Sequence, residues 1–190
     1  MSINILLAGV GGQGLVLTTK IICEAAFKQG YDVKSNDVVG LSQRGGKVWG
    51  SVKIGEKIYS PNILPGCGDF LIGLEPLEGL RLSYLMREKG TIILNKKIIP
   101  PVPVIFEKEI YPINLYDSLK EKFNVISIDA TQEGIKMGSE KVANTILIGM
   151  LAKKIDIPND VWHLAIKENV PTKFIDMNIK AFEFGLTNFR

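Results

Sequence analysis

The stretch Ile3-Asn-Ile-Leu-Leu-Ala-Gly-Val-Gly-Gly-Gln-Gly14 decides the fold of this chain. Its apolar, largely branched residues over Ile3–Ala8 predict a strand that is buried on both faces. A turn rich in glycine follows, and a helical pattern then runs over Gln13–Gln29 and stops at Gly30. A buried strand, a tight turn and a helix start in this order predict an α/β domain with a ligand site at the turn.

The glycines of this turn suit close contact with an anion. Glycine adopts positive φ and lacks a Cβ that would block a phosphate, and a helix start offers unpaired N–H groups and a positive dipole end. A second glycine-rich turn, Leu41-Ser-Gln-Arg-Gly-Gly46, contains one of the few arginines of the chain. Guanidinium is the better bidentate partner for anions. The predicted binding residues are therefore Gly9, Gly11, Gly12, Gln13 and Gly14 in the first turn, and Ser42, Gln43, Arg44, Gly45 and Gly46 in the second.

Simpler interpretations of both turns stay open. The first turn would also serve just to pack a strand closely against a helix, and the second would serve as a surface turn. An NAD site needs an acidic residue that closes the second strand. Asp32 opens that strand and Asp37 falls beyond it, so the sequence does not favour NAD.

The composition of the chain excludes several classes of protein. The chain has 190 residues, is 46% hydrophobic, and carries a net charge of +3. These values predict a single domain over residues 1–190, with too little positive charge for a nucleic-acid binder. We find neither an apolar run of about 20 residues nor a signal peptide, so we expect a cytoplasmic protein without a membrane segment. Cys23, Cys67 and His163 are too few for an iron–sulfur or zinc site, so we assign no metal ligand.

Alternating elements follow the first strand and helix. The pattern predicts a three-layer α/β/α Rossmann-like domain with a mixed, mostly parallel sheet and a helical C-terminal part. Lys47–Ile54 and Lys57–Ser60 are expected to form a hairpin around Gly55-Glu56, and Ile98–Pro112 an extended or looped edge segment. Further strands are predicted over Asp32–Ser35, Phe70–Leu74, Thr91–Leu94 and Val125–Ile128. Helices are predicted over Pro76–Lys89, Leu115–Phe123, Glu140–Lys154, Asn159–Glu168 and Thr172–Phe184. The N-caps of the last two helices are predicted at Asn159 and Thr172.

Three further candidates for chemistry have plainer interpretations. Glu75 and Glu78 follow a buried strand and would share one helix face, as an acid–base pair does, but acids in a first turn more often complement the helix dipole. His163 lies within a predicted helix, where a packed or surface histidine is the usual case. Cys67 has no basic neighbour in sequence and is interpreted as a loop residue. We therefore assign no catalytic residue to this chain.

Several segments together carry a family resemblance that covers essentially the whole chain. They are the two glycine-rich turns, Gly9–Gly14 and Leu41–Gly46, followed by Leu74-Glu-Pro-Leu-Glu78, Asp129-Ala-Thr131, Val142-Ala-Asn144 and Lys180-Ala-Phe-Glu-Phe-Gly185. In this order they resemble the γ module of the 2-oxoacid:ferredoxin oxidoreductases. Within that family they look like the small (β) subunits of indolepyruvate ferredoxin oxidoreductase. Ser42-Gln-Arg-Gly-Gly46 is similar to the indolepyruvate branch, since pyruvate-type γ subunits tend to carry Glu-Arg-Arg-Gly there.

The resemblance implies a role in the oxidative decarboxylation of a 2-oxo acid. Coenzyme A accepts the acyl group and ferredoxin the electrons, while a large α subunit binds thiamine diphosphate and the iron–sulfur clusters. This chain would bear no cofactor of its own and would help to enclose the active site. Its glycine turns would contact the partner subunit or a coenzyme A phosphate, with Arg44 as the charged member.

Two other classes stay open on sequence grounds. A Gly-Xaa-Gly-Gly-Xaa-Gly turn also suits ATP in an adenylating enzyme, although such enzymes usually add cysteine pairs and further arginines. A free-standing nucleotide-binding or assembly module, as a homodimer when isolated, would also have this sequence. The three classes differ in the partner that the protein would bind: ATP for an adenylating enzyme, a second copy of the chain for a free-standing module, and a large subunit for an oxidoreductase subunit.

Overall fold

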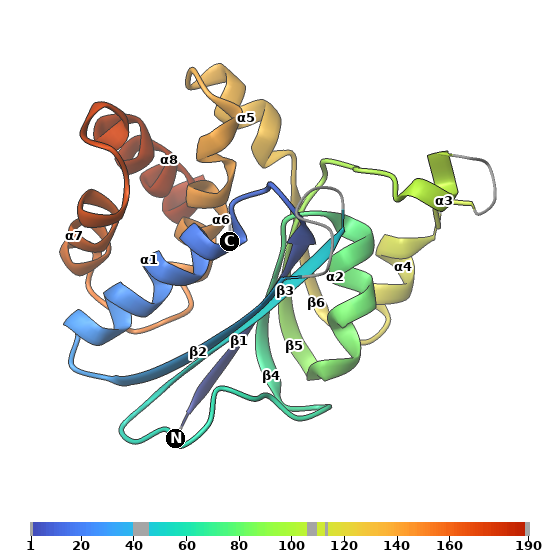
Figure 1. Cartoon of the computed structure of the whole chain (residues 1–190), viewed down its shortest axis with the longest axis horizontal. Helices are drawn as coiled ribbons and strands as arrows, with labels where there is room; N and C mark the ends of the chain where they lie inside the picture. Colours follow the sequence, from blue (N-terminus) through green and yellow to red (C-terminus); the bar gives the residue numbers. More distant parts are fainter. Residues whose placement is uncertain (1, 40–45, 106–109, 113, 189–190) are drawn as a thin grey trace.

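The computed structural model describes residues 2–39, 46–105, 110–112 and 114–188. Strands and helices alternate through most of the chain, and helices make up its C-terminal part (Figure 1). The strands are β1 (Ile3–Val10), β2 (Asp32–Val39), β3 (Lys47–Gly55), β4 (Gly68–Gly73), β5 (Met86–Asn95) and β6 (Asn124–Ile128). The α-helices are α1 (Leu15–Lys28), α2 (Pro76–Leu82), α3 (Val102–Ile105), α4 (Leu115–Lys120), α5 (Ala130–Lys136), α6 (Ala143–Ala152), α7 (Asn159–Asn169) and α8 (Ile175–Asn188). Short 3-10 turns cover Ser83–Leu85, Glu140–Val142 and Thr172–Phe174.

The strands form one sheet in the order β2-β3-β1-β4-β5-β6. β1, β4, β5 and β6 run parallel, whereas β3 is antiparallel to both of its neighbours. The prediction of a mixed, mostly parallel sheet is confirmed. α1 leads from β1 to β2 on one side, and β4, β5 and β6 follow on the other, so the carboxyl end of β1 is the switch point where open α/β sheets bind ligands.

Helices cover both faces of the sheet (Figure 1). The side chains of β1 alternate, so Leu7 faces the core beneath α1, α6, α7 and α8, while Leu6 faces the core beneath α2 and α4. Trp162 of α7 and Phe182 of α8 are fully buried in the larger core, with ring centroids 6.0 Å apart. The three-layer architecture is therefore as the sequence predicts.

The predicted hairpin is wrong in its second strand. Lys47–Ile54 lies within β3, but β3 pairs with β1 along one edge and with β2 along the other. No edge of β3 is left for Lys57–Ser60, which is irregular in structure. The carboxylate of Asp32 accepts a hydrogen bond from the backbone N–H of Ile58 at 2.7 Å and so holds this segment at the start of β2. β2 also extends further than predicted, to Val39, because it pairs with β3 throughout.

Other element ends differ for local reasons. The predicted helix from Pro76 ends at Leu82 and turns through Ser83–Leu85 into β5, so Gly90 lies within a strand. A Cβ on Gly90 would lie 2.8 Å from Met86 Cε and 3.2 Å from the Gly68 carbonyl, so glycine allows a close backbone approach there. The N-caps of α7 and of the turn before α8 are Pro158 and Pro171, one residue before the predicted positions. The Ile98–Pro112 segment contains the short helix α3.

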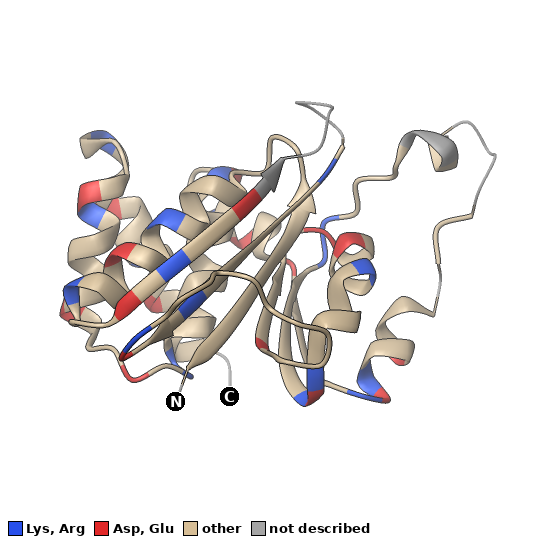
Figure 2. Ribbon diagram, turned by 60° about the horizontal axis from the view of Figure 1, so that its bottom comes forward, with Lys and Arg blue, Asp and Glu red and all other residues tan. Residues whose placement is uncertain are grey.

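Basic and acidic positions are interspersed along the ribbon of the described residues (Figure 2). The outer strand β2, for example, carries Asp32, Lys34 and Asp37 in turn. Within the described residues, each helix is too short or too polar to cross a bilayer.

Candidate functional site

The turn after β1 opens the positive end of α1 toward solvent. Gly12 and Gly14 have φ of 98° and 80°, a region that glycine adopts without strain. Gly14 is the N-cap of α1, which has no side-chain cap and no acidic residue in its first turn. The N–H groups at the start of a fourteen-residue helix therefore remain available to an anionic group.

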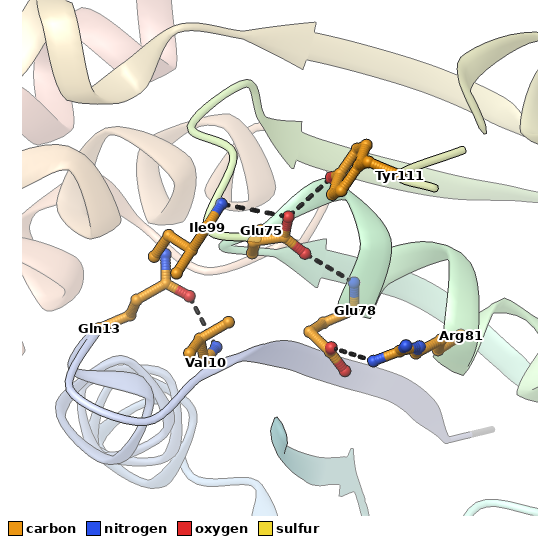
Figure 3. A network of polar contacts seen from close by, with 7 residues as sticks. All are labelled: Val10, Gln13, Glu75, Glu78, Arg81, Ile99 and Tyr111. Carbon is orange, nitrogen blue, oxygen red and sulfur yellow. Dashed lines mark hydrogen bonds and ion pairs between the residues drawn. The ribbon is translucent and has the colours of Figure 1, made fainter. Parts of the chain in front are cut away.

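Gln13 fixes the turn through its side chain (Figure 3). Its Oε1 accepts a hydrogen bond from the backbone N–H of Val10 at 2.7 Å, and its Nε2 donates to the carbonyl of Leu74 at 2.9 Å. Gly9 lies in β1 beneath this amide, where a Cβ would come within 2.9 Å of Gln13 Oε1 and 3.1 Å of Leu74 Cβ. Gln13 thereby joins the turn after β1 to the end of β4.

The two glycine-rich turns meet at one point. The backbone N–H of Gly11 donates to the carbonyl of Gly46 at 2.8 Å. The other four predicted binding residues of the second turn, Ser42, Gln43, Arg44 and Gly45, lie outside the described residues. Gly46, the last residue of the second turn, therefore lies beside Gly11 of the first turn.

A cleft of about 490 Å³ lies at the carboxyl ends of β1, β5 and β6. Backbone of the first turn forms one wall, and α5, α6 and α8 contribute residues to the rest. The predicted residues on its wall are Gly11, Gly12, Gln13 and Gly14; those not predicted include Asn95, Lys97, Ile99, Thr131, Lys141 and Asn144. The volume is that of a typical small-molecule site.

Asn144 ties α6 to the first turn. Its Nδ2 donates to the Gln13 carbonyl at 2.7 Å and to the Thr18 hydroxyl at 3.1 Å. The same Nδ2 would lie 3.2 Å from a Cβ at Gly14. The Val142-Ala-Asn144 segment, noted in the sequence only for its resemblance, is thus part of the wall that shapes the turn.

Asn95 ends β5 and lines the cleft, and only 3% of its surface is exposed. Its Nδ2 donates to the Thr131 hydroxyl at 3.0 Å, and its buried Oδ1 has no hydrogen-bond partner. A buried polar atom without a partner costs free energy, and at a cleft it is a position that a ligand can satisfy. Sequence reasoning missed Asn95, although its place directly after the buried strand Thr91–Leu94 was a usable signal.

Charge at the cleft comes from Lys97, Lys141 and Glu140. Lys97 Nζ lies 2.8 Å from a Glu140 carboxylate oxygen, and this hydrogen bond lowers the pKa of Glu140. Lys141 follows directly in the chain and adds a second cation to the wall. With the start of α1, the balance at the cleft favours an anionic ligand group.

The Glu75–Glu78 pair is structural rather than an acid–base pair (Figure 3). Glu75 is 1% exposed and caps α2 by accepting the Glu78 N–H at 2.9 Å, while its other oxygen accepts the Tyr111 hydroxyl at 2.7 Å and the Ile99 N–H at 3.5 Å. Burial and the Glu75 carboxylate raise the pKa of Tyr111. Burial also raises the pKa of Glu78, although its partner Arg81 lies at 2.7 Å. Glu75 therefore anchors both ends of the 98–112 segment to α2.

The remaining candidates lie apart from the cleft. His163 pairs with Glu183 and packs edge-on against Phe182, as a packed histidine does. Cys67 is exposed in a loop, and burial raises the pKa of Cys23 to about 11. Among the described residues, no three His, Cys, Asp or Glu side chains group as metal ligands do.

Fold and site together define an α/β module with an anion-favouring cleft at the switch point of its sheet. The family described as "Pyruvate ferredoxin/flavodoxin oxidoreductase" matches residues 4–187. The chain is 34% identical over 189 residues to the indolepyruvate oxidoreductase subunit IorB of Pyrococcus horikoshii, covering 96% of this chain and 94% of that protein. The chain therefore belongs to the pyruvate ferredoxin/flavodoxin oxidoreductase family, and the predicted family is confirmed.

Solved structures agree on the fold. The γ subunit of a keto/oxoacid ferredoxin oxidoreductase from Geobacter sulfurreducens superposes with a TM-score of 0.72 at 22% identity, covering 97% of this chain and 96% of that one. The 2-oxoglutarate:ferredoxin oxidoreductase of Magnetococcus marinus, with 2-oxoglutarate, coenzyme A and succinyl-CoA bound, gives a TM-score of 0.77 at 16% identity. It covers all of this chain and 32% of the longer one.

Proposed function

We propose that this chain is the small subunit of a cytoplasmic indolepyruvate-type 2-oxoacid:ferredoxin oxidoreductase, in which residues 1–190 act as one domain. Its partner is a large α subunit that binds thiamine diphosphate and the iron–sulfur clusters. The complex converts a 2-oxo acid, coenzyme A and two oxidised ferredoxins into acyl-CoA, carbon dioxide, a proton and two reduced ferredoxins. In this proposal the chain is inactive alone, because thiamine diphosphate and the clusters are bound by the partner.

The uncapped start of α1 is the observation that carries this proposal. It faces a cleft with two lysines and is held in shape by Gln13 and Asn144. Such a wall suits the phosphates of coenzyme A, which carry several negative charges. Thiamine diphosphate supplies the electron sink for decarboxylation, on the partner subunit. This chain's residues bind the anionic acceptor, orient it, and exclude water.

The preference for an arylpyruvate rests on the name of the similar Pyrococcus horikoshii protein and on the Ser-Gln-Arg-Gly-Gly form of the second turn. The Magnetococcus marinus enzyme, which shares the fold, is described with coenzyme A bound and so supports the choice of acyl acceptor. The pocket for the 2-oxo acid belongs to the partner in this proposal.

The test is reconstitution with a large α subunit of the indolepyruvate type from the same source. Both chains are co-expressed without oxygen, and ferredoxin reduction is followed with indolepyruvate, pyruvate and 2-oxoglutarate. We expect a stable complex, CoA-dependent reduction, and the highest kcat/KM for indolepyruvate. ATP–pyrophosphate exchange by the chain alone would establish an adenylating enzyme instead, and recovery only as a homodimer would establish a free-standing module.

Variants of the reconstituted complex separate the binding role from assembly. Arg44→Ala removes the arginine of the second turn and is expected to raise the KM for coenzyme A about tenfold, the effect of one charge-assisted hydrogen bond. Arg87→Ala is the control, because Arg87 pairs with Asp69 at the start of β5, away from the carboxyl edge. Unchanged assembly and an unchanged KM for coenzyme A in Arg44→Ala would refute the assigned role of the turn.

A further inference from the structure

Asn95 and Thr131 form a polar pair at the cleft that internal packing does not explain. The amide donates to the Thr131 hydroxyl at 3.0 Å, which fixes its orientation, yet its Oδ1 stays buried and unpaired. Both residues stand at the carboxyl ends of neighbouring strands, Asn95 at the end of β5 and Thr131 just after β6. A buried acceptor that is oriented but unsatisfied costs stability in the unligated chain.

The open start of α1 lines the same cleft. The cleft thus offers N–H donors and lysine charge to an anion, and the unpaired Oδ1 of Asn95 to an N–H or O–H donor. A ligand that satisfies both carries an anionic group and a hydrogen-bond donor in one molecule. Because Asn95 is only 3% exposed, a donor on a slender chain reaches it with less steric hindrance than one on a broad ring system.

We propose that Asn95 is a specificity-determining residue of the cleft, whose Oδ1 accepts a hydrogen bond from an amide N–H of the pantetheine arm of coenzyme A. Thr131 is the positioning residue that holds the Asn95 amide in the accepting orientation. This inference rests on the proposed function for the identity of the ligand, while the orphaned acceptor and the open helix start are observations independent of it.

The test measures binding by the full chain, without turnover. Coenzyme A, pantetheine and adenosine 3′,5′-bisphosphate are titrated calorimetrically into wild type and Asn95→Leu, which has a similar branched shape but no polar atoms. We expect Asn95→Leu to bind coenzyme A about tenfold more weakly and to bind adenosine 3′,5′-bisphosphate as wild type does. The melting temperature without ligand is expected to be unchanged or higher, because an unpaired buried acceptor is removed.

The chain provides a matched control in Asn4. Its Oδ1 is also buried and unpaired, and its Nδ2 donates to the Cys67 carbonyl at 2.8 Å, at the beginning of β1 and so at the opposite end of that strand from the glycine turn. Asn4→Leu is expected to bind coenzyme A with wild-type affinity. Should Asn95→Leu fail to fold, Thr131→Val replaces it, with an expected affinity loss of about threefold.

Three results overturn the inference. The first is equal affinity of wild type and Asn95→Leu for coenzyme A, and the second is no binding of coenzyme A by wild type. The third is a lower melting temperature of Asn95→Leu with equal losses for coenzyme A and adenosine 3′,5′-bisphosphate, which is the behaviour of a structural residue. The proposed function is judged separately, by arylpyruvate oxidation in the reconstituted complex, so either can fail while the other holds.

Discussion

Replacing Gln13 with alanine tests whether its side chain serves the fold of the glycine turn. The Gln13 amide accepts from the Val10 N–H at 2.7 Å and donates to the Leu74 carbonyl at 2.9 Å. Val10 and Leu74 are 6% and 1% exposed, so water cannot readily replace the amide. Gln13→Ala would therefore leave a buried donor and a buried acceptor without these partners.

The cost follows from those two bonds. Leaving a buried backbone group unsatisfied costs about 1–2 kcal/mol, so we expect the free energy of unfolding to fall by about 2–4 kcal/mol. For a chain of this size, about 1 kcal/mol lowers the melting temperature by about 2–4 °C, which predicts a loss of about 5–15 °C. The assay is thermal unfolding followed by circular dichroism, with urea unfolding for the free energy.

Gln132→Ala is the control, because Gln132 is an exposed glutamine in the first turn of α5. Its melting temperature should stay within about 2 °C of wild type. Gln13→Glu keeps an acceptor for Val10 but sets a second acceptor against the Leu74 carbonyl. The melting temperature of Gln13→Glu should approach that of wild type below about pH 5, where a protonated carboxyl can donate to the Leu74 carbonyl. A Gln13→Ala melting temperature equal to that of Gln132→Ala would refute the reasoning.

Three further predictions concern regions away from the cleft. Gly149→Ala should destabilise the chain by about 3 kcal/mol or more, because a Cβ there would overlap the Phe182 carbonyl where α6 crosses α8; a urea midpoint like that of wild type would contradict this. Iodoacetamide at pH 8 should label exposed Cys67 well before Cys23, whose pKa is raised to about 11 by burial, and peptide mass spectrometry gives the order. Asp32→Asn should unfold more easily than wild type at pH 7, because the Ile58 N–H and Lys34 lower the pKa of Asp32 in the folded state. An acid with a lowered pKa contributes stability above its unfolded pKa of about 3.9 and loses that contribution as pH falls. The melting temperatures of wild type and Asp32→Asn should therefore converge below about pH 3. A difference in melting temperature that stays constant from about pH 7 to about pH 2 would count against this ion pair.

Part of the candidate site was predictable because its signal is local. The Ile3–Gly14 stretch contains its own strand, its glycines and its helix start, and the structure places Gly11, Gly12, Gln13 and Gly14 on the cleft wall. The capping role of Glu75 was also predictable, since a carboxylate before Pro76 meets the first N–H groups of a helix. Each of these inferences depends on neighbours within a few residues in the sequence.

Other features depend on partners that lie far apart in the chain. Gln13 had a predicted binding role, but its side chain bonds to Leu74, and Asn144 reaches the Gln13 carbonyl across 131 positions of sequence. The position of Asn95 after a buried strand marks it as a residue at the carboxyl edge, but its pairing with Thr131 and its unpaired Oδ1 appear only in the folded structure. Local patterns carry no information about such pairs.

The sequence by itself determined the α/β class, the first strand–turn–helix unit and the family, because apolar periodicity and glycine positions act over short distances. Only the tertiary structure decided that β3 lies between β1 and β2 and that Lys57–Ser60 is not a strand. A strand can pair along two edges, and which segments take those edges depends on competition among all strands of the sheet. The cleft exists for the same reason, since the carboxyl ends of β1, β5 and β6 meet only after the sheet has formed.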